Sequence, residues 1–166
     1  MKNKLRAGII GATGMVGQRF ITLLHDHPYF EITALAASAR SAGVPYGKAV
    51  EGRWKLKAEL PADVAEIPVT DAANIEEMKS KCDFVFCAVN MKKDDILALE
   101  SAYAKAEIPV ISNNSANRWT DDVPMVIPEI NDAHLEVIES QKKRLGTKRG
   151  FIAVNRTARY RVTFPR

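Results

Sequence analysis

The sequence of 166 residues has few cysteines and histidines and no long hydrophobic run. Its two cysteines, Cys82 and Cys87, lie in one short apolar segment, too close along an extended strand to pair as a disulfide. We expect two buried, reduced thiols and no bound metal, and we interpret His25 and His27 as exposed residues at a helix end. No apolar run could span a bilayer, and the N-terminus lacks the hydrophobic region of a secretory signal. These absences predict a cytoplasmic protein with no membrane partner.

Acidic residues are absent from residues 155–166, which contain four arginines. Without these, the 24 Lys and Arg fall to 20, which equals the 20 Asp and Glu, so the net charge of +4 is local to the end of the chain. A neutral body argues against a nucleic-acid surface across the domain, and we expect no nucleic-acid partner. Salt-dependent binding through the arginines alone stays an alternative hypothesis.

The most informative stretch is Gly11-Ala12-Thr13-Gly14-Met15-Val16-Gly17. Residues 4–10 before it predict a strand, and residues 15–25 have helical periodicity, with Val16, Phe20, Leu23 and Leu24 on one side. Glycines at such a corner allow a tight turn and close approach of the backbone to a ligand, and the helix N-terminus attracts phosphate. The spacing is a variant of the dinucleotide-binding fingerprint. A glycine-rich turn that only packs helix on strand is the alternative interpretation.

The rest of the chain alternates apolar runs with helical patterns, which predicts an α/β, Rossmann-type doubly wound fold with a mostly parallel sheet and helices on both faces. Strands are expected at residues 30–37, 66–69, 83–89, 108–111 and 150–154, with a short edge strand at 52–57. Helices are expected at residues 74–79 (capped by Asp71 or Asn74), 94–106 (with Ile96, Leu97, Leu99, Ala102 and Tyr103 inward) and 131–145 (capped by Asn131 and ended by Gly146).

The end of the second predicted strand indicates which dinucleotide would bind. In NAD-binding domains an acidic residue there takes a ribose hydroxyl, but residues 38–43 contain no acid. Arg40 instead lies between Ser38 and Ser41, and a guanidinium with two hydroxyls suits a 2′-phosphate. The pattern favours NADP over NAD, with a solvated loop arginine as the alternative.

Polar residues also follow two later strands. Residues 90–93 come after the apolar run at 83–89, and residues 112–118, rich in serine and asparagine, come after the run at 108–111. Ligands bind at the carboxyl edge of such sheets, so both segments are candidates for cofactor or anion contacts. From the residues alone, a capped polar loop explains residues 112–118 equally well.

Taken in order, these motifs, together with Val123-Pro124-Met125-Val126-Ile127-Pro128-Glu129-Ile130-Asn131, resemble the N-terminal domain of aspartate-semialdehyde dehydrogenase. The similarity covers residues 1–154 and is greatest to the archaeal and fungal branch. It implies an NADPH-dependent oxidoreductase that reduces 4-aspartyl phosphate to the semialdehyde with release of phosphate, in lysine, threonine and methionine biosynthesis. The intact family enzyme is homo-oligomeric.

The resemblance also assigns roles to residues of this chain. Cofactor contacts would come from Gly11, Thr13, Gly14, Met15 and Val16 at the phosphates and from Ser38, Arg40 and Ser41 at the 2′-phosphate. Arg118 resembles the arginine that holds the acyl phosphate, with Asn113 and Asn114 near it.

The chain departs from the family after residue 154. There the family continues into Pro-Asn-Cys-Ser, whose cysteine is the nucleophile, and then into a second domain for catalysis and dimerisation. Here Ala158 stands at the cysteine's place, so we expect no catalytic residue and no dehydrogenase activity in this chain alone. We divide the chain into an NADP-binding domain, 1–154, and a non-family basic tail, 155–166, which we expect to be disordered, with the second domain absent.

The tail is interpreted as frame-shifted coding sequence. A family-like Lys-Pro-Asn-Cys-Ser-Ile-Gln-Ser-Tyr-Val-Pro can be encoded so that loss of one nucleotide in the first codon spells residues 155–165, and sequencing the gene's 3′ region tests this. Two further hypotheses stay open: a related acetylglutamyl-phosphate reductase, whose motifs fit less well, and a non-enzymatic NADP-binding or redox-sensing module.

Overall fold

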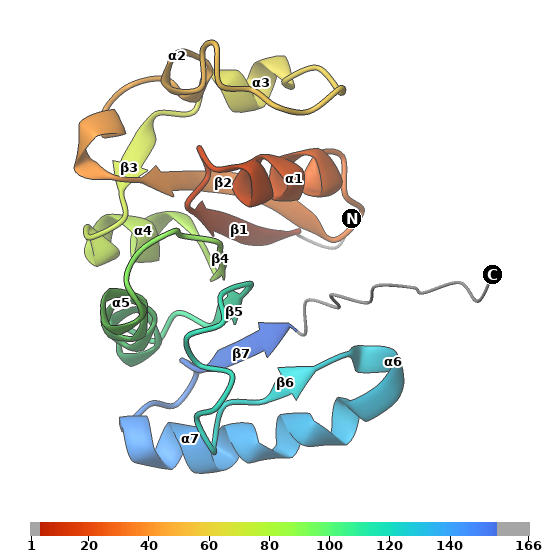
Figure 1. Ribbon diagram of the computed structural model, residues 1–166, viewed down its shortest axis with the longest axis vertical. Helices are drawn as coiled ribbons and strands as arrows, with labels where there is room; N and C mark the ends of the chain where they lie inside the picture. Colours follow the sequence, from red (N-terminus) through yellow and green to blue (C-terminus); the bar gives the residue numbers. More distant parts are fainter. Residues whose placement is uncertain (1–3, 156–166) are drawn as a thin grey trace, which may run out of the picture.

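The computed structural model describes residues 4–155, which form one parallel sheet of seven strands flanked by helices (Figure 1). The strand order is β3-β2-β1-β4-β5-β7-β6, and every pair of neighbours is parallel. The strands are β1 Leu5–Ile10, β2 Phe30–Ala37, β3 Val69–Asp71, β4 Phe84–Cys87, β5 Val110–Ser112, β6 Met125–Val126 and β7 Ile152–Asn155. This confirms the doubly wound α/β fold expected from the sequence. Ala158 and the rest of 156–166 lie outside the described residues.

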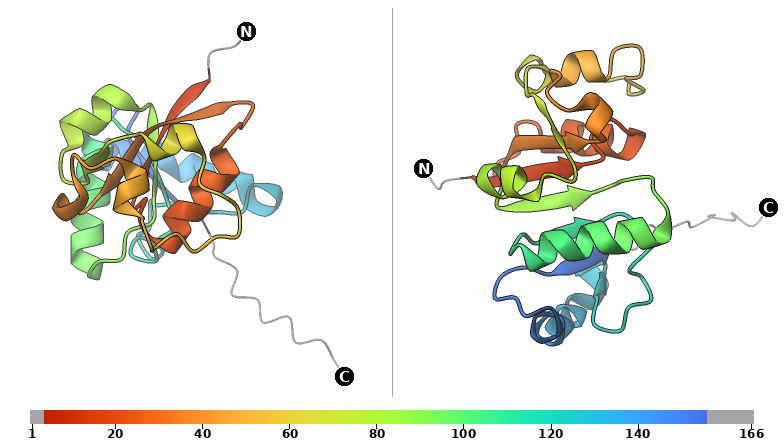
Figure 2. Two further views of the ribbon diagram at one scale, coloured as in Figure 1. Left: turned by 90° about the horizontal axis from the view of Figure 1, so that it is seen from above. Right: turned by 90° about the vertical axis from the view of Figure 1, so that its left-hand side faces the viewer.

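Helices connect the strands on both faces of the sheet. They are α1 Met15–Leu24, η1 Ala39–Ser41, α2 Tyr46–Ala49, α3 Ala62–Ala65, α4 Ile75–Lys81, α5 Lys93–Lys105, α6 Pro128–Asn131, η2 Asp132–Val137 and α7 Ile138–Leu145. Figures 1 and 2 show α1 on one face and α4 and α5 on the other. No helix within residues 4–155 is both long and apolar enough to cross a membrane.

The core lies in two layers because successive residues of a strand face opposite sides of the sheet. Ile9 of β1 packs with the residues of α1 to α3, whereas its neighbour Ile10 packs with those of α4 and α5. Strands buried on both faces read as continuous apolar runs, which is why β1, β2 and β4 were readable from the sequence. The two layers fix β1 and β4 at the centre of the sheet, where the candidate site lies.

Several local predictions are wrong in position or face. Residues 52–57 form no strand; their Lys55 N–H donates instead to the Gln18 side chain at 2.8 Å. On α1, Val16 and Leu23 are exposed, and the buried face carries Gln18, Ile21 and Leu24.

Two further boundaries differ from the predictions. The helix expected at 131–145 starts at Pro128 and is divided into α6, η2 and α7, while Gly146 ends it with a φ of +71° as predicted. Asn131 does not cap that helix, because its side chain bonds the backbone of Ile127 and Met125. The strand expected at 66–69 is β3, two to three residues further on. Asn74 caps α4 by accepting from the Glu77 N–H.

Candidate functional site

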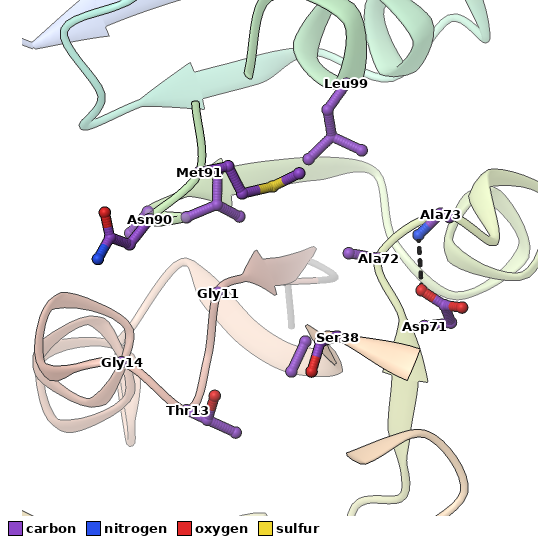
Figure 3. A pocket seen from close by; sticks show the side chains of 13 residues that line it. Gly11, Thr13, Gly14, Ser38, Asp71, Ala72, Ala73, Asn90, Met91 and Leu99 are labelled. Carbon is purple, nitrogen blue, oxygen red and sulfur yellow. Dashed lines mark hydrogen bonds between the residues drawn. The ribbon is translucent and has the colours of Figure 1, made fainter. Parts of the chain in front are cut away.

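A cavity of about 420 Å³ lies at the carboxyl ends of β1, β2, β3 and β4 (Figure 3). The chain order reverses between β1 and β4, so the connections leaving these two strands separate to opposite faces and open a crevice. The lining residues are Gly11, Thr13, Gly14, Ala37, Ser38, Asp71, Ala72, Ala73, Ala88, Val89, Asn90, Met91 and Leu99. Their dispersion over the sequence shows that the sheet edge assembles this site.

Two glycines of the predicted fingerprint are required sterically at this corner. Gly11 has a φ of +83°, and a Cβ there would lie 2.5 Å from the Ala88 carbonyl oxygen. A Cβ at Gly17 would lie 2.3 Å from the Gly11 carbonyl oxygen. A Cβ at Gly14 would meet nothing closer than 3.4 Å, so packing does not demand glycine there. The glycines at 11 and 17 therefore let the loop, α1 and the end of β4 approach closely.

Backbone hydrogen bonds hold the start of the loop on β2. The N–H groups of Gly11 and Ala12 both donate to the Ala36 carbonyl oxygen, at 2.8 and 3.0 Å. Gly14 N–H turns back to the Gly11 carbonyl oxygen at 3.0 Å. These three backbone bonds define the conformation of the corner from within the protein.

The helix that follows presents its N-terminal amides beside the cavity. The first helical bond of α1 runs from Gln18 N–H to Gly14 O at 2.9 Å, so the N–H groups of Met15 and Val16 precede the ladder. Thr13 and Gly14 line the cavity, and Met15 and Val16 are exposed next to it. This is the positive end of a ten-residue helix, which suits an anionic group.

The segment after β2 reaches the same cavity through one residue. Ser38 lines it, whereas Arg40 and Ser41 lie in the short helix η1 immediately beyond, with Arg40 exposed. The cavity therefore has the N-terminal end of α1 beside one wall, and Arg40 lies two residues beyond the serine that lines another.

Sequence reasoning missed part of the cavity wall. Asp71 lines it from the end of β3, and its carboxylate accepts the Ala73 N–H at 3.0 Å. Ala72 is held by Tyr103, whose hydroxyl donates to the Ala72 carbonyl oxygen at 2.8 Å. Its position in the sequence could have indicated this, because Asp71 lies at the carboxyl end of a strand and the carboxyl ends of parallel strands share one edge of the sheet.

A second cavity, of about 580 Å³, adjoins the first. It shares Val89, Asn90 and Met91 with the first cavity and is completed by Ile96, Asn113, Asn114, Ser115 and Arg118. The structure therefore brings together all three residues expected to bind the substrate, next to the expected cofactor site. Residues 90 and 91 join the two spaces.

The loop that carries Arg118 rests on a buried acid that the sequence did not single out. Glu100 of α5 is 1% exposed, and its carboxylate accepts from Ser112 Oγ at 2.5 Å, Asn117 Nδ2 at 2.7 Å and Asn114 Nδ2 at 2.9 Å. The side-chain amide of Asn114 also faces Cys87 Sγ at 3.4 Å. Asn114 therefore uses its amide beneath the loop, to hold it in place, although it also borders the second cavity.

Both cysteines are free and buried. Cys82 directly follows α4 and precedes β4, so it does not share a strand with Cys87, contrary to the expectation. Burial raises the pKa of the Cys82 thiol to about 11. Burial and the nearby Glu100 charge raise the pKa of Cys87 further. Neither thiol forms a thiolate readily near neutral pH.

Within residues 4–155, no group of three or more His, Cys, Asp or Glu residues is placed to hold a metal ion.

A doubly wound parallel sheet with a glycine-rich corner and a crevice at its switch point defines a nucleotide-binding domain of Rossmann type. The comparison with known families narrows this class. Residues 6–138 match the family described as semialdehyde dehydrogenase, NAD binding domain, and the chain belongs to that family.

Known relatives agree with this assignment. Aspartate-semialdehyde dehydrogenase of Aspergillus fumigatus is 42% identical over 152 residues, 92% of this chain and 40% of that protein. The enzyme of the same name from Methanothermobacter thermautotrophicus is 44% identical over 153 residues, 91% of this chain and 41% of that protein. A crystal structure of the Candida albicans enzyme with NADP is 40% identical, with a TM-score of 0.80, and the match covers 92% of this chain and 42% of that one. The chain thus spans about two fifths of the length of these relatives.

Proposed function

We propose that this chain binds NADPH in the cavity between β1 and β4, as the cofactor-binding part of an aspartate-semialdehyde dehydrogenase. The observation that carries the proposal is the cavity itself, with helix N-terminal amides at one wall and Ser38 at another. The Candida albicans relative, which was solved with NADP, supports the same choice of cofactor.

Each end of the cofactor has a chemical counterpart. The amides of Thr13, Met15 and Val16 would donate to the pyrophosphate, next to the backbone of Gly11 and Gly14. Arg40, with the hydroxyls of Ser38 and Ser41, would bind the 2′-phosphate, because a guanidinium bonds phosphate oxygens in a bidentate manner. An acid that would repel that phosphate is absent from residues 38–43.

The second cavity is the proposed substrate site. Arg118 would hold the phosphate of 4-aspartyl phosphate, with Asn113 beside it and Asn114 fixing the loop from below. NADPH, when bound, supplies the hydride for reduction of the acyl group. Arg118 and Asn113 orient the substrate, and Met91 lies between the two cavities.

We further propose that these 166 residues alone bind the cofactor without turnover. Reduction of an acyl phosphate by this family passes through a cysteine thiolate, and both cysteines here are buried with raised pKa values. A non-catalytic NADP-sensing module would also bind NADPH without turnover, so NADPH binding alone does not distinguish the two hypotheses. Titration with inorganic phosphate in the presence of saturating NADPH, which fills the first cavity, separates the two. Only a substrate site predicts phosphate binding under these conditions and its loss in an Arg118→Ala variant.

The test of cofactor binding is calorimetric titration of the chain with NADPH and NADH. We expect NADPH to bind more tightly, and Arg40→Ala to lose about ten-fold or more in NADPH affinity with little change for NADH, since a charged hydrogen bond contributes about 1.5–3 kcal/mol. Lys79→Ala removes the same charge from an exposed position on α4 and serves as the matched control. A chain that binds neither nucleotide, or that prefers NADH, would contradict the proposal.

A further inference from the structure

A buried tyrosine contacts the glycine-rich loop from inside the protein. Tyr46, the first residue of α2, is 0% exposed and packs in the core layer on the α1 face of the sheet. Its hydroxyl donates to the Ala12 carbonyl oxygen at 2.7 Å, across 34 positions of sequence. Ala12 is itself 0% exposed, so this bond lies where water does not compete.

The bond fixes more than one atom because a peptide unit is planar and trans. In such a unit the carbonyl of residue 12 and the N–H of residue 13 point in opposite directions. When Tyr46 holds the Ala12 carbonyl on the core side, the Thr13 N–H is directed away from the core. Thr13 lines the 420 Å³ cavity, so its amide is oriented towards the space proposed for the pyrophosphate.

A second buried side chain fixes the next peptide unit. Gln18 is 1% exposed, and its Nε2 donates to the Thr13 carbonyl oxygen at 3.2 Å and to the Arg53 carbonyl oxygen at 2.9 Å. Its Oε1 accepts the Lys55 N–H at 2.8 Å, which ties the amide to the segment after α2. The carbonyl of Ala12, in the peptide unit before Thr13, and the carbonyl of Thr13, in the unit after it, are thus both hydrogen-bonded to buried side chains.

We propose that Tyr46 is a positioning residue for cofactor binding, which orients the Thr13 amide towards the pyrophosphate through its bond to Ala12. The inference rests on the proposed NADPH site. The hydroxyl touches no ligand; it prevents rotation of the peptide unit that would turn the Thr13 N–H away. Burial raises the pKa of Tyr46, so the hydroxyl stays a hydrogen-bond donor across the physiological range.

The test compares two ligands in the wild type and in Tyr46→Phe. NADPH uses both the 2′-phosphate and the pyrophosphate, whereas 2′-AMP carries the 2′-phosphate alone and does not reach the loop amides. We expect Tyr46→Phe to weaken NADPH binding about three- to ten-fold and to change 2′-AMP binding less than two-fold, because one neutral hydrogen bond is lost. Tyr29→Phe, the same change at an exposed tyrosine, should alter neither affinity.

The ratio of the two affinities makes the result independent of folding. A variant that is partly unfolded loses apparent affinity for both ligands equally, so its NADPH to 2′-AMP ratio stays that of the wild type. An unchanged ratio in Tyr46→Phe would overturn the positioning role while leaving the NADPH site intact. A wild-type chain that binds neither ligand would overturn the proposed function, and the positioning role with it.

Discussion

Glu100 illustrates what a single residue contributes to this site. It lies four positions after Ile96 on α5, so the buried face of the helix runs through Ile96, Glu100, Tyr103 and Ala104. Hydrophobic periodicity predicts that the apolar residues of a helix are buried, so it does not identify an acidic residue such as Glu100 as part of the buried face. The structure shows why the acid is tolerated: three side-chain donors from residues 112–117 satisfy its carboxylate.

Removing that carboxylate should destabilise the protein strongly. Glu100→Ala leaves three donors without their acceptor in a buried place, and we expect a loss of about 3 kcal/mol or more in the free energy of unfolding. Urea denaturation measures this, with Glu59→Ala, an exposed acid in a loop, as a control expected within about 0.5 kcal/mol of the wild type. Equal unfolding midpoints for Glu100→Ala and wild type would show that the cluster contributes nothing.

At the scale of elements, α5 is joined to the start of β7 by a carboxylate. Glu107, with a φ of +69°, follows α5, and its side chain accepts the backbone N–H groups of Lys148, Arg149 and Gly150 at 2.6–3.1 Å. A Cβ at Gly150 would lie 1.8 Å from the Ala104 carbonyl oxygen, so the two segments are in close contact. The carboxylate therefore holds the segment that leads into β7, the strand next to the β6 edge of the sheet.

The hydrogen bonds from the Glu107 carboxylate to the backbone of residues 148–150, here called the Glu107 clasp, predict a dependence of stability on pH. The three amides lower the pKa of Glu107 from 4.5 to about 2, so its folded-state value lies below its unfolded-state value. Its stabilisation is therefore fully present above pH 4.5 and is lost as the pH falls towards about 2. Glu107→Gln should lower the urea midpoint at neutral pH and flatten its decline in this acid range, whereas Glu59→Gln should not. A parallel decline in Glu107→Gln and wild type would contradict the clasp.

Elements differ in how far their own residues decide them. The runs that became β1, β2 and β4 are apolar enough to specify strands, and the pattern of α1 specifies a helix but not its buried face. Val16 was expected inside because it is apolar, yet it is exposed in the first turn of the helix. Gln18 is inside because loop carbonyls supply its partners, which no local pattern reveals.

At the scale of the whole molecule, ligand binding and folding are linked. The proposed NADPH site draws on four strand ends, so it exists only when the sheet is assembled. A ligand that binds only the folded state at one hundred times its Kd adds about 2.7 kcal/mol to the free energy of unfolding.

Thermal unfolding should therefore shift upward by about 5–10 °C with NADPH at that excess. NADH at the same concentration should give a smaller shift, because it lacks the phosphate expected at Arg40. Calorimetry checks both values, and Lys79→Ala should behave as the wild type does. An equal shift with the two nucleotides would contradict selection by the 2′-phosphate.

The sequence by itself determined the fold class, the glycine-rich corner and the polar segments after β2 and β5, because these depend on local periodicity, backbone freedom and side-chain chemistry. Only the tertiary structure decided which of these residues share a cavity and that Asp71 belongs to the wall of the first. It also decided that Tyr46 and Gln18 hold the glycine-rich loop of the first cavity and that Glu100 holds the loop of the second. The physical reason is that a buried polar side chain is stable only beside its partners, and here those partners come from distant segments that the parallel sheet brings to one edge.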